Sequence, residues 1–124
     1  DCDVIQADAG TRTASITGSW LALVKGMDRL LEEGQLKENP LKAQVAAISV
    51  GLVKGKPLLD LDYSEDSIAD VDLNVVMDSH GCFLEIQGTA ENSAFKRAEL
   101  NKLLDLAEAG IYELHAAQLS ALRE

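Results

Sequence analysis

Residue types that bind anions stand together near the start of the sequence, in the stretch QADAGTRTASITG. Gly10 lets the backbone approach a ligand closely, and Thr11 and Thr13 offer hydroxyl donors. Arg12 adds a planar fork suited to two phosphate oxygens, and the N–H groups of a helix beginning here would face the same space. An anion site explains this pattern. Helix capping by a Thr or Ser hydroxyl, with Arg12 paired to a local aspartate, explains it too. The GxxxxGK[ST] spacing of a P-loop is absent.

A second stretch, LDLDYSEDSIADVDLN, holds six carboxylates within 13 residues: Asp60, Asp62, Glu65, Asp66, Asp70 and Asp72. In a helical turn Asp66 and Asp70 would stack on one face, whereas in a strand Asp70 and Asp72 would share a face. Crowded like charges are destabilising, so such a cluster is typical of a cation site or of a raised pKa. Hard oxygen ligands suit Mg²⁺ or Mn²⁺. A solvated acidic loop explains the run as well, and the run does not fit the EF-hand pattern.

A third stretch, EIQGTAENSAF, joins a strand-like run to the last helix-like run. Gly88 and Thr89 indicate a tight turn, and Glu91 is another carboxylate. By itself this stretch is typical of an ordinary connecting loop.

The elements that must position these residues follow from hydrophobic periodicity and turn residues. These patterns predict, in chain order, a strand over residues 2–7, a helix over 13–33, strands over 44–53 and 56–63, strands over 72–78 and 82–88, and a helix over 97–122. Gly34 stands where a helix C-cap belongs, and Lys54-Gly55-Lys56 marks a hairpin turn. The order β-α-ββ-ββ-α predicts an α+β fold, in which helices pack on a face of a sheet. Because the chain opens in mid-strand without an initiator Met, we expect a fragment that is incomplete at its N-terminus.

Composition narrows the class of protein. A length of 124 residues with 47% hydrophobic residues indicates one globular domain with a real core. The net charge of −10 argues against an ordinary nucleic-acid binder, so an RNA role requires positive charge from elsewhere or bound metal ions.

Cys2 and Cys82 lack the spacing of a zinc site or disulfide framework, and we expect two buried thiols in a reducing cytosol. No run approaches the roughly 18–20 apolar residues of a membrane span, so we expect no membrane partner.

Taken together, these stretches resemble the C-terminal half of the ribonuclease PH family of phosphate-dependent 3′→5′ exoribonucleases. The resemblance rests on DCDVIQADAGTRTASITG, VAAISVGLV, LLDLDYSEDSIADVDLNVVM, LEIQGTAE and the closing Leu/Ala-rich helix, in the family's order and approximate spacing. It implies the ribonuclease PH fold, which is similar to domain 2 of ribosomal protein S5, with residues 1–124 as the C-terminal half of a single domain of this type. The related domains of polynucleotide phosphorylase and the exosome ring match LDLDYSEDS and QGTAE less well.

The resemblance also implies roles for individual residues. The family's GTR tripeptide holds the attacking inorganic phosphate, here Gly10, Thr11 and Arg12. Two aspartates six residues apart are the catalytic and metal-binding pair, here Asp66 and Asp72, with Mg²⁺ or Mn²⁺ as the metal. One of the two would give a proton to the departing 3′ oxygen, with Asp70 as a helper. The sequence departs from the family at Ala9, where a second glycine is usual.

The implied activity is trimming of tRNA precursor 3′ ends, with a further role in rRNA processing, by phosphorolysis that releases nucleoside diphosphates. In reverse this is nucleotidyl transfer to RNA 3′ ends. The family assembles as a homo-hexamer, a trimer of dimers, in the cytoplasm. Its N-terminal half supplies another phosphate-contacting arginine and basic RNA-binding surface, so we expect the 124-residue piece alone to be inactive.

Two other functions remain open. One is a non-catalytic, exosome-like ring subunit that serves as an RNA-binding scaffold; such subunits typically lose the acidic pair or the phosphate-binding arginine. The other is an acidic globular domain that binds a partner protein through its helices.

Overall fold

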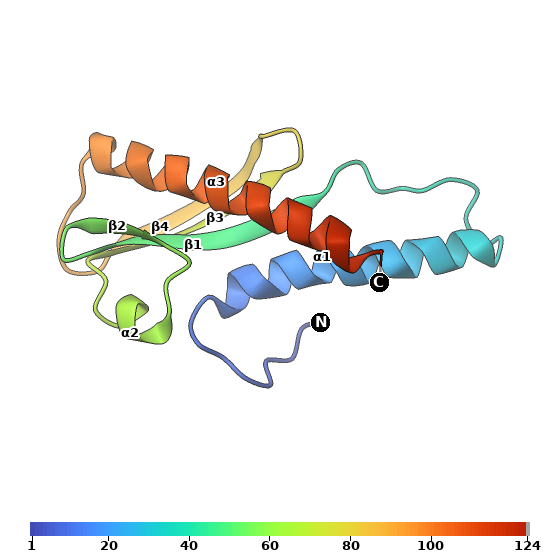
Figure 1. Ribbon diagram of the computed structural model, residues 1–124, viewed down its shortest axis with the longest axis horizontal. Coiled ribbons are helices and arrows are strands. Elements are labelled where there is room, and N and C mark those ends of the chain that lie inside the picture. The colour runs from blue at the N-terminus through green and yellow to red at the C-terminus, as the bar shows by residue number, and fades with distance from the viewer. Residues whose placement is uncertain (124) are drawn as a thin grey trace.

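The computed structural model describes residues 1–123, which form a four-stranded antiparallel sheet and three helices (Figure 1). The elements in chain order are α1 (Thr11–Glu32), β1 (Val45–Val53), β2 (Lys56–Leu59), α2 (Tyr63–Asp66), β3 (Val71–Asp78), β4 (Phe83–Ala90) and α3 (Arg97–Ala121). The strand order across the sheet is β2-β1-β3-β4. The α+β class expected from the sequence is confirmed.

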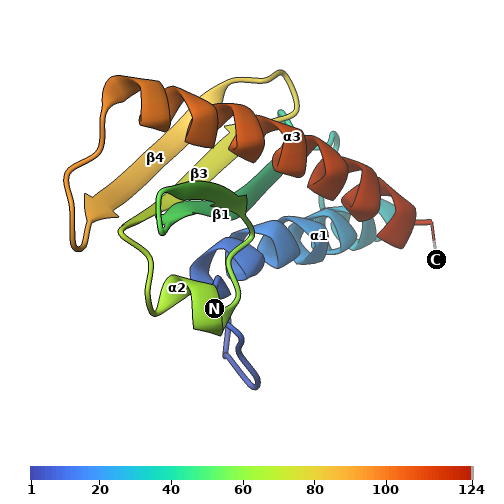
Figure 2. The same ribbon diagram turned by 60° about the vertical axis from the view of Figure 1, so that its left-hand side comes forward.

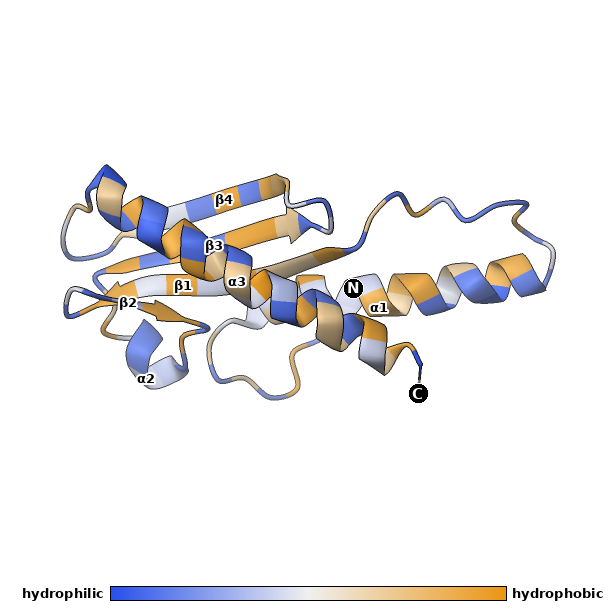
Figure 3. Cartoon of the chain, turned by 45° about the horizontal axis from the view of Figure 1, so that its top comes forward, coloured by the Kyte–Doolittle hydropathy of each residue, from blue (hydrophilic) through white to orange (hydrophobic). Residues whose placement is uncertain are grey.

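The main core lies between α3 and one face of the sheet. Alternate residues of β1 and β3 point to this face, as the two-residue period of a strand requires, and they meet an apolar stripe of α3. The buried members are Ala46, Ile48, Val50, Leu52, Val71, Leu73, Val75, Met77, Leu103, Ala107 and Ile111. Figure 3 shows this pattern as hydrophobic colour along much of β3, whereas β4 alternates between hydrophobic and hydrophilic residues.

Helix α1 packs along β1 (Figure 2). The short strand β2 pairs with only part of the edge of β1, and α1 covers the rest of that edge. The Thr17 hydroxyl accepts from Ala47 N at 3.0 Å and donates to Ala47 O at 3.1 Å. Buried Gln118 of α3 donates to Val45 O at 3.0 Å and to Thr17 O at 2.8 Å. Side chains of two helices therefore satisfy this strand edge in place of a neighbouring strand.

Several local predictions are confirmed. The turn between β1 and β2 has left-handed Lys54 and Gly55, with φ of 51° and 72°, as a type I′ hairpin requires. Gly34 follows α1 with φ of 71°, and its N–H donates to Leu31 O at 3.0 Å. The helices expected over 13–33 and 97–122 match α1 and α3 within two residues at each end.

Other local predictions are wrong. Residues 2–7 form no strand in the described structure, because no other described strand pairs with them, and Ile5 is 99% exposed. The second strand ends at Leu59, since Asp60 adopts a left-handed φ of 54° and the chain then turns into α2. The observed order is therefore α-ββ-α-ββ-α. Cys2 and Cys82 are both exposed, because they lie in the irregular N-terminal segment and in the β3–β4 turn.

Within residues 1–123, no helix combines the length and the hydrophobicity that a membrane crossing requires.

Candidate functional site

The start of α1 is an uncapped helix N-terminus. Ala9 and Gly10 have left-handed φ angles of 59° and 56°, and Gly10 is the N-cap. No described side chain caps this end; Thr13 Oγ1 instead donates to Gly10 O at 2.9 Å. The first helical hydrogen bond runs from Ala14 N to Gly10 O, so the preceding N–H groups remain available to an anion. Capping by a Thr or Ser hydroxyl, the alternative explanation of this stretch, is therefore absent from the described residues.

Arg12 extends from α1 to the far edge strand of the sheet. Its Nη2 lies 2.9 Å from Glu85 Oε1 and 3.0 Å from Glu85 Oε2. The partner is thus a glutamate of β4, 73 residues along the chain, and not a local aspartate. The Arg12 side chain is 47% exposed, so the rest of the guanidinium can still donate to an incoming anion.

Asp66 and Asp72 line the same pocket, which has a volume of about 410 Å³. Asp66 is the last residue of α2, Asp72 lies in β3, and Glu91 directly follows β4. The lining residues are Asp66, Ser67, Ala69, Asp72, Glu91 and Asn92. The structure therefore brings the predicted pair together and adds Glu91, which looked like part of an ordinary loop. No sequence pattern marks Glu91, because it reaches the pocket only through the pairing of β3 with β4.

The backbone of Asp70 holds this pocket in shape. Its N–H donates to Leu52 O at 2.7 Å, and its carbonyl accepts from Glu91 N at 2.9 Å. Asn92 Nδ2 donates to Ala69 O at 3.2 Å. The Asp70 residue is not among those lining the pocket, and a helper role for its carboxylate stays a prediction.

Part of the acidic run is structural. The Asp62 carboxylate accepts from the Ser64 hydroxyl at 2.7 Å and from Glu65 N at 2.9 Å, while Glu65 Oε2 accepts from Asp62 N at 3.2 Å. This is a capping box at the start of α2. The hydrogen bond from Ser64, followed by that from Glu65, lowers the pKa of Asp62. The D-x-x-E spacing is the sequence signal that identifies this role.

A hydrogen bond joins the two motifs that the sequence singles out. Asp8 Oδ1 accepts from Tyr63 N at 3.0 Å. The loop that leads into Gly10 is thereby tied to the first turn of α2, whose last residue is Asp66.

The surroundings of Asp72 disfavour its ionised form. Burial raises the pKa of Asp72, and the nearby Asp66 and Glu91 carboxylates raise this pKa further. A cation in the pocket would relieve the same repulsion.

The chemistry of these donors fits a hard divalent cation. Within residues 1–123, no three acidic, histidine or cysteine side chains lie close enough to enclose an ion by themselves. Mg²⁺ is commonly held by one or two carboxylates together with water and substrate phosphates. Asp66 and Asp72 provide two such carboxylates beside open space.

The sheet register puts Glu85, which pairs with Arg12, and Asp72 of the acidic pocket on the sheet face opposite α3. Glu85 lies opposite Val76, and Thr89 lies opposite Asp72; directly opposed residues share a face. Glu85 and Thr89 are four residues apart on β4, which corresponds to about 13 Å along a strand. The position where Arg12 meets β4 and the Asp72 carboxylate therefore lie on a common surface, about 13 Å apart along the strand direction.

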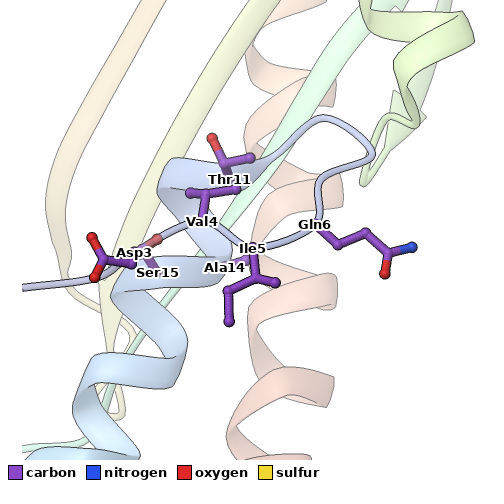
Figure 4. Close-up of a pocket in the computed structure, with 7 residues that line it drawn as sticks. All are labelled: Asp3, Val4, Ile5, Gln6, Thr11, Ala14 and Ser15. Atoms are coloured by element: carbon purple, nitrogen blue, oxygen red, sulfur yellow. The ribbon is translucent and has the colours of Figure 1, made fainter.

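A second hollow, with a volume of about 300 Å³, lies between the N-terminal segment and the first turns of α1 (Figure 4). Its lining residues are Asp3, Val4, Ile5, Gln6, Thr11, Ala14 and Ser15. Thr11 is its only member among the predicted site residues within residues 1–123.

Comparison with known proteins identifies the family. Residues 43–110, more than half of the chain, match the family described as "3' exoribonuclease family, domain 2". The chain belongs to the 3′ exoribonuclease family. It is 68% identical over 124 residues to Ribonuclease PH of Prochlorococcus marinus (strain MIT 9313) and 64% identical over 124 residues to that of Synechococcus sp. (strain CC9605). These matches cover 100% of this chain but 51% and 50% of the relatives, so the chain spans about half their length. The resemblance to ribonuclease PH is confirmed.

Two solved structures share the fold of this 3′ exoribonuclease family member. Rice (Oryza sativa) Rrp46 has a TM-score of 0.74 at 16% identity, over 98% of this chain and 52% of that one. The Archaeoglobus fulgidus exosome with RNA bound to the active site has a TM-score of 0.56 at 20% identity, over 69% of this chain and 35% of that one. At these identities the likeness concerns the fold alone, and it agrees with the ribonuclease PH-like fold expected from the sequence.

Proposed function

We propose that this chain carries the phosphate-binding and carboxylate parts of a phosphate-dependent 3′→5′ exoribonuclease that trims tRNA precursors. Inorganic phosphate would attack the last phosphodiester of the RNA and release a nucleoside diphosphate; the reverse reaction would transfer a nucleotide to an RNA 3′ end. The observation that carries the proposal is the common sheet face shared by Arg12, at an uncapped helix N-terminus, and by the Asp66–Asp72 pocket.

The reaction brings two anions together, so their repulsion must be offset. Gly10, Thr11 and Arg12 would hold the inorganic phosphate through backbone N–H groups, a hydroxyl and the guanidinium. Glu85 would keep the Arg12 side chain extended over the sheet. Asp66 and Asp72 would hold Mg²⁺ or Mn²⁺, which when bound supplies positive charge to the phosphodiester. One of these two aspartates would give a proton to the departing 3′ oxygen.

The partners follow from the same proposal. The net charge of −10 leaves little positive surface for RNA, so the N-terminal half found in the relatives would supply much of the basic surface and a second arginine. We infer a cytoplasmic homo-hexamer, a trimer of dimers, as its assembly. RNA 3′ ends, above all those of tRNA precursors, are its proposed substrates.

The direct test is to incubate the intact protein with a short 3′-tailed RNA, with and without phosphate and Mg²⁺. We expect nucleoside diphosphates only when both are present. Release of monophosphates in phosphate-free buffer would indicate hydrolysis and would contradict the proposal.

Arg12→Ala tests the phosphate site. We expect kcat/KM for phosphate to fall by about 10²-fold or more, because the main charged donor to the nucleophile is lost. Arg29→Ala is the matched control: Arg29 lies in the last turn of the same helix, pairs with Glu33 at 2.8 Å, and is far along the sequence from the site. Equal activity of the two variants would exclude the assigned role of Arg12.

The scaffold alternative makes the opposite prediction. A non-catalytic ring subunit would bind RNA without releasing nucleoside diphosphates. The presence of Arg12, Asp66 and Asp72 together supports the enzyme.

A further inference from the structure

Three polar residues in register cross the centre of the sheet on one face. Ser49 of β1 is directly opposite Asn74 of β3, and Asn74 is directly opposite Gln87 of β4. The three side chains share the face opposite α3, since the neighbouring Ile48, Val75 and their partners point into the α3 core.

The row is buried at its Ser49 end and exposed to solvent at its Gln87 end. Ser49 is 3% exposed and lies under the start of α1, where a Cβ added to Gly10 would come 3.8 Å from Ser49 Oγ. Asn74 is partly buried, and Gln87 is exposed on the edge strand. The row therefore runs from beneath Gly10 to open solvent.

The buried hydroxyl of the row lacks a protein partner among residues 1–123. Ser49 Oγ is one of two buried side-chain polar atoms there without a hydrogen bond. Ser49 O accepts from Asp60 N at 2.8 Å, so the Ser49 backbone faces β2. Ser49 and Asn74 therefore form a non-hydrogen-bonded pair, whose Cα atoms come about 4.5 Å apart and whose side chains lie close together. A buried hydroxyl without a partner calls for an explanation, and a hydrogen bond to the neighbouring Asn74 amide when a ligand is bound would supply one.

The row lies midway between the two parts of the proposed site. Gln87 is two residues from Glu85, the Arg12 partner, and two residues from Thr89, the Asp72 partner. Each step is about 7 Å along the strand. A phosphodiester attacked by a phosphate at Arg12 and neutralised at Asp72 would lie between these two positions, over this row.

We propose that the side-chain amides of Asn74 and Gln87 donate hydrogen bonds to the non-bridging oxygens of the scissile phosphodiester, and that Ser49 positions Asn74. This inference rests on the proposed function. In the reaction a phosphate oxygen forms a bond to the phosphorus, the bond to the 3′ oxygen breaks, and that oxygen takes a proton. The two amides neither gain nor lose protons. They are neutral donors where the neighbouring carboxylates would repel the substrate.

The test uses Asn74→Asp and Gln87→Glu in the intact protein, because these changes keep shape while replacing an N–H donor by a negative charge. At saturating phosphate and Mg²⁺ we expect kcat to fall by about tenfold or more in each. KM for phosphate should stay within about twofold, since Arg12 is untouched. Asn101→Ala, which removes an exposed amide from α3 on the other side of the sheet, should leave both constants unchanged.

Ser49→Ala tests whether Ser49 positions Asn74 or only stabilises the fold. The substitution should lower kcat when Asn74 is present and should lower kcat no further in the Asn74→Ala background. Additive losses would exclude the positioning role of Ser49, and wild-type kcat in both acidic variants would overturn the inference as a whole. If the wild-type protein releases no nucleoside diphosphate, the proposed function itself fails, which is a separate result.

Discussion

Asp72 has a raised pKa because it is partly buried and faces the Asp66 and Glu91 carboxylates. A carboxyl group whose folded-state pKa lies above its ordinary value of 3.8 binds protons more tightly when folded. Its ionisation therefore costs folding free energy at every pH above the folded pKa, and the cost disappears below the ordinary pKa. The residue proposed to serve catalysis thus opposes folding.

Asp72→Asn should accordingly stabilise the metal-free protein at pH 7 while abolishing phosphorolysis. We expect the free energy of unfolding to rise by less than about 1 kcal/mol, because water screens a partly exposed carboxylate. Urea unfolding in a chelator, at pH 7 and again below pH 3.8, measures the effect. At the lower pH the wild-type Asp72 is protonated in both the folded and the unfolded state. If Asp72→Asn still raised the free energy of unfolding there, the cost of ionising Asp72 would not be the cause.

The glycine at the N-cap of α1 and a glycine inside this helix have opposite effects on stability. Gly10 begins the helix with φ of 56°, whereas Gly26 lies within the helix, is exposed and has no atom within 4 Å of an added Cβ. Gly10→Ala should destabilise by about 1 kcal/mol or more, since alanine is strained at this φ. Gly26→Ala should stabilise by about 0.5–1 kcal/mol through helix propensity. Urea midpoints shifted in opposite directions would bear out both expectations; the same sign for both would not.

Buried Gln118 joins both long helices to the sheet. Only 2% exposed, it donates to Thr17 O and Val45 O and accepts from Gln44 Nε2 at 2.8 Å. Gln118→Met keeps the volume but leaves these groups unpaired in a buried setting. We expect a loss of about 2–3 kcal/mol in the free energy of unfolding.

The matched control is Gln35→Met, which removes an exposed amide that donates a hydrogen bond to Glu33 Oε2 at 2.7 Å. Its substitution should change stability by less than about 0.5 kcal/mol. If the two variants melted at the same temperature, Gln118 would not link the layers in the way described.

Features that depend on near neighbours could be predicted from the sequence. The span of α1 follows from apolar residues at helical spacing, and the Lys54–Gly55 turn follows from residues that tolerate positive φ. The strand predicted over 2–7 failed because a strand needs a partner that its own residues do not specify. The exposure of Cys2 and Cys82 was missed for a similar reason, since burial depends on what packs above a residue.

For the site, the candidate residues can be named from the sequence: Arg12 in an anion-binding stretch, and Asp66 and Asp72 in an acidic run. The contact of Arg12 with Glu85, the position of Glu91 beside the aspartates, and the row of Ser49, Asn74 and Gln87 are visible only in the folded chain. These arrangements depend on strand register. Pairing between strands distant in the sequence places these side chains on a common face, and no short stretch encodes that pairing.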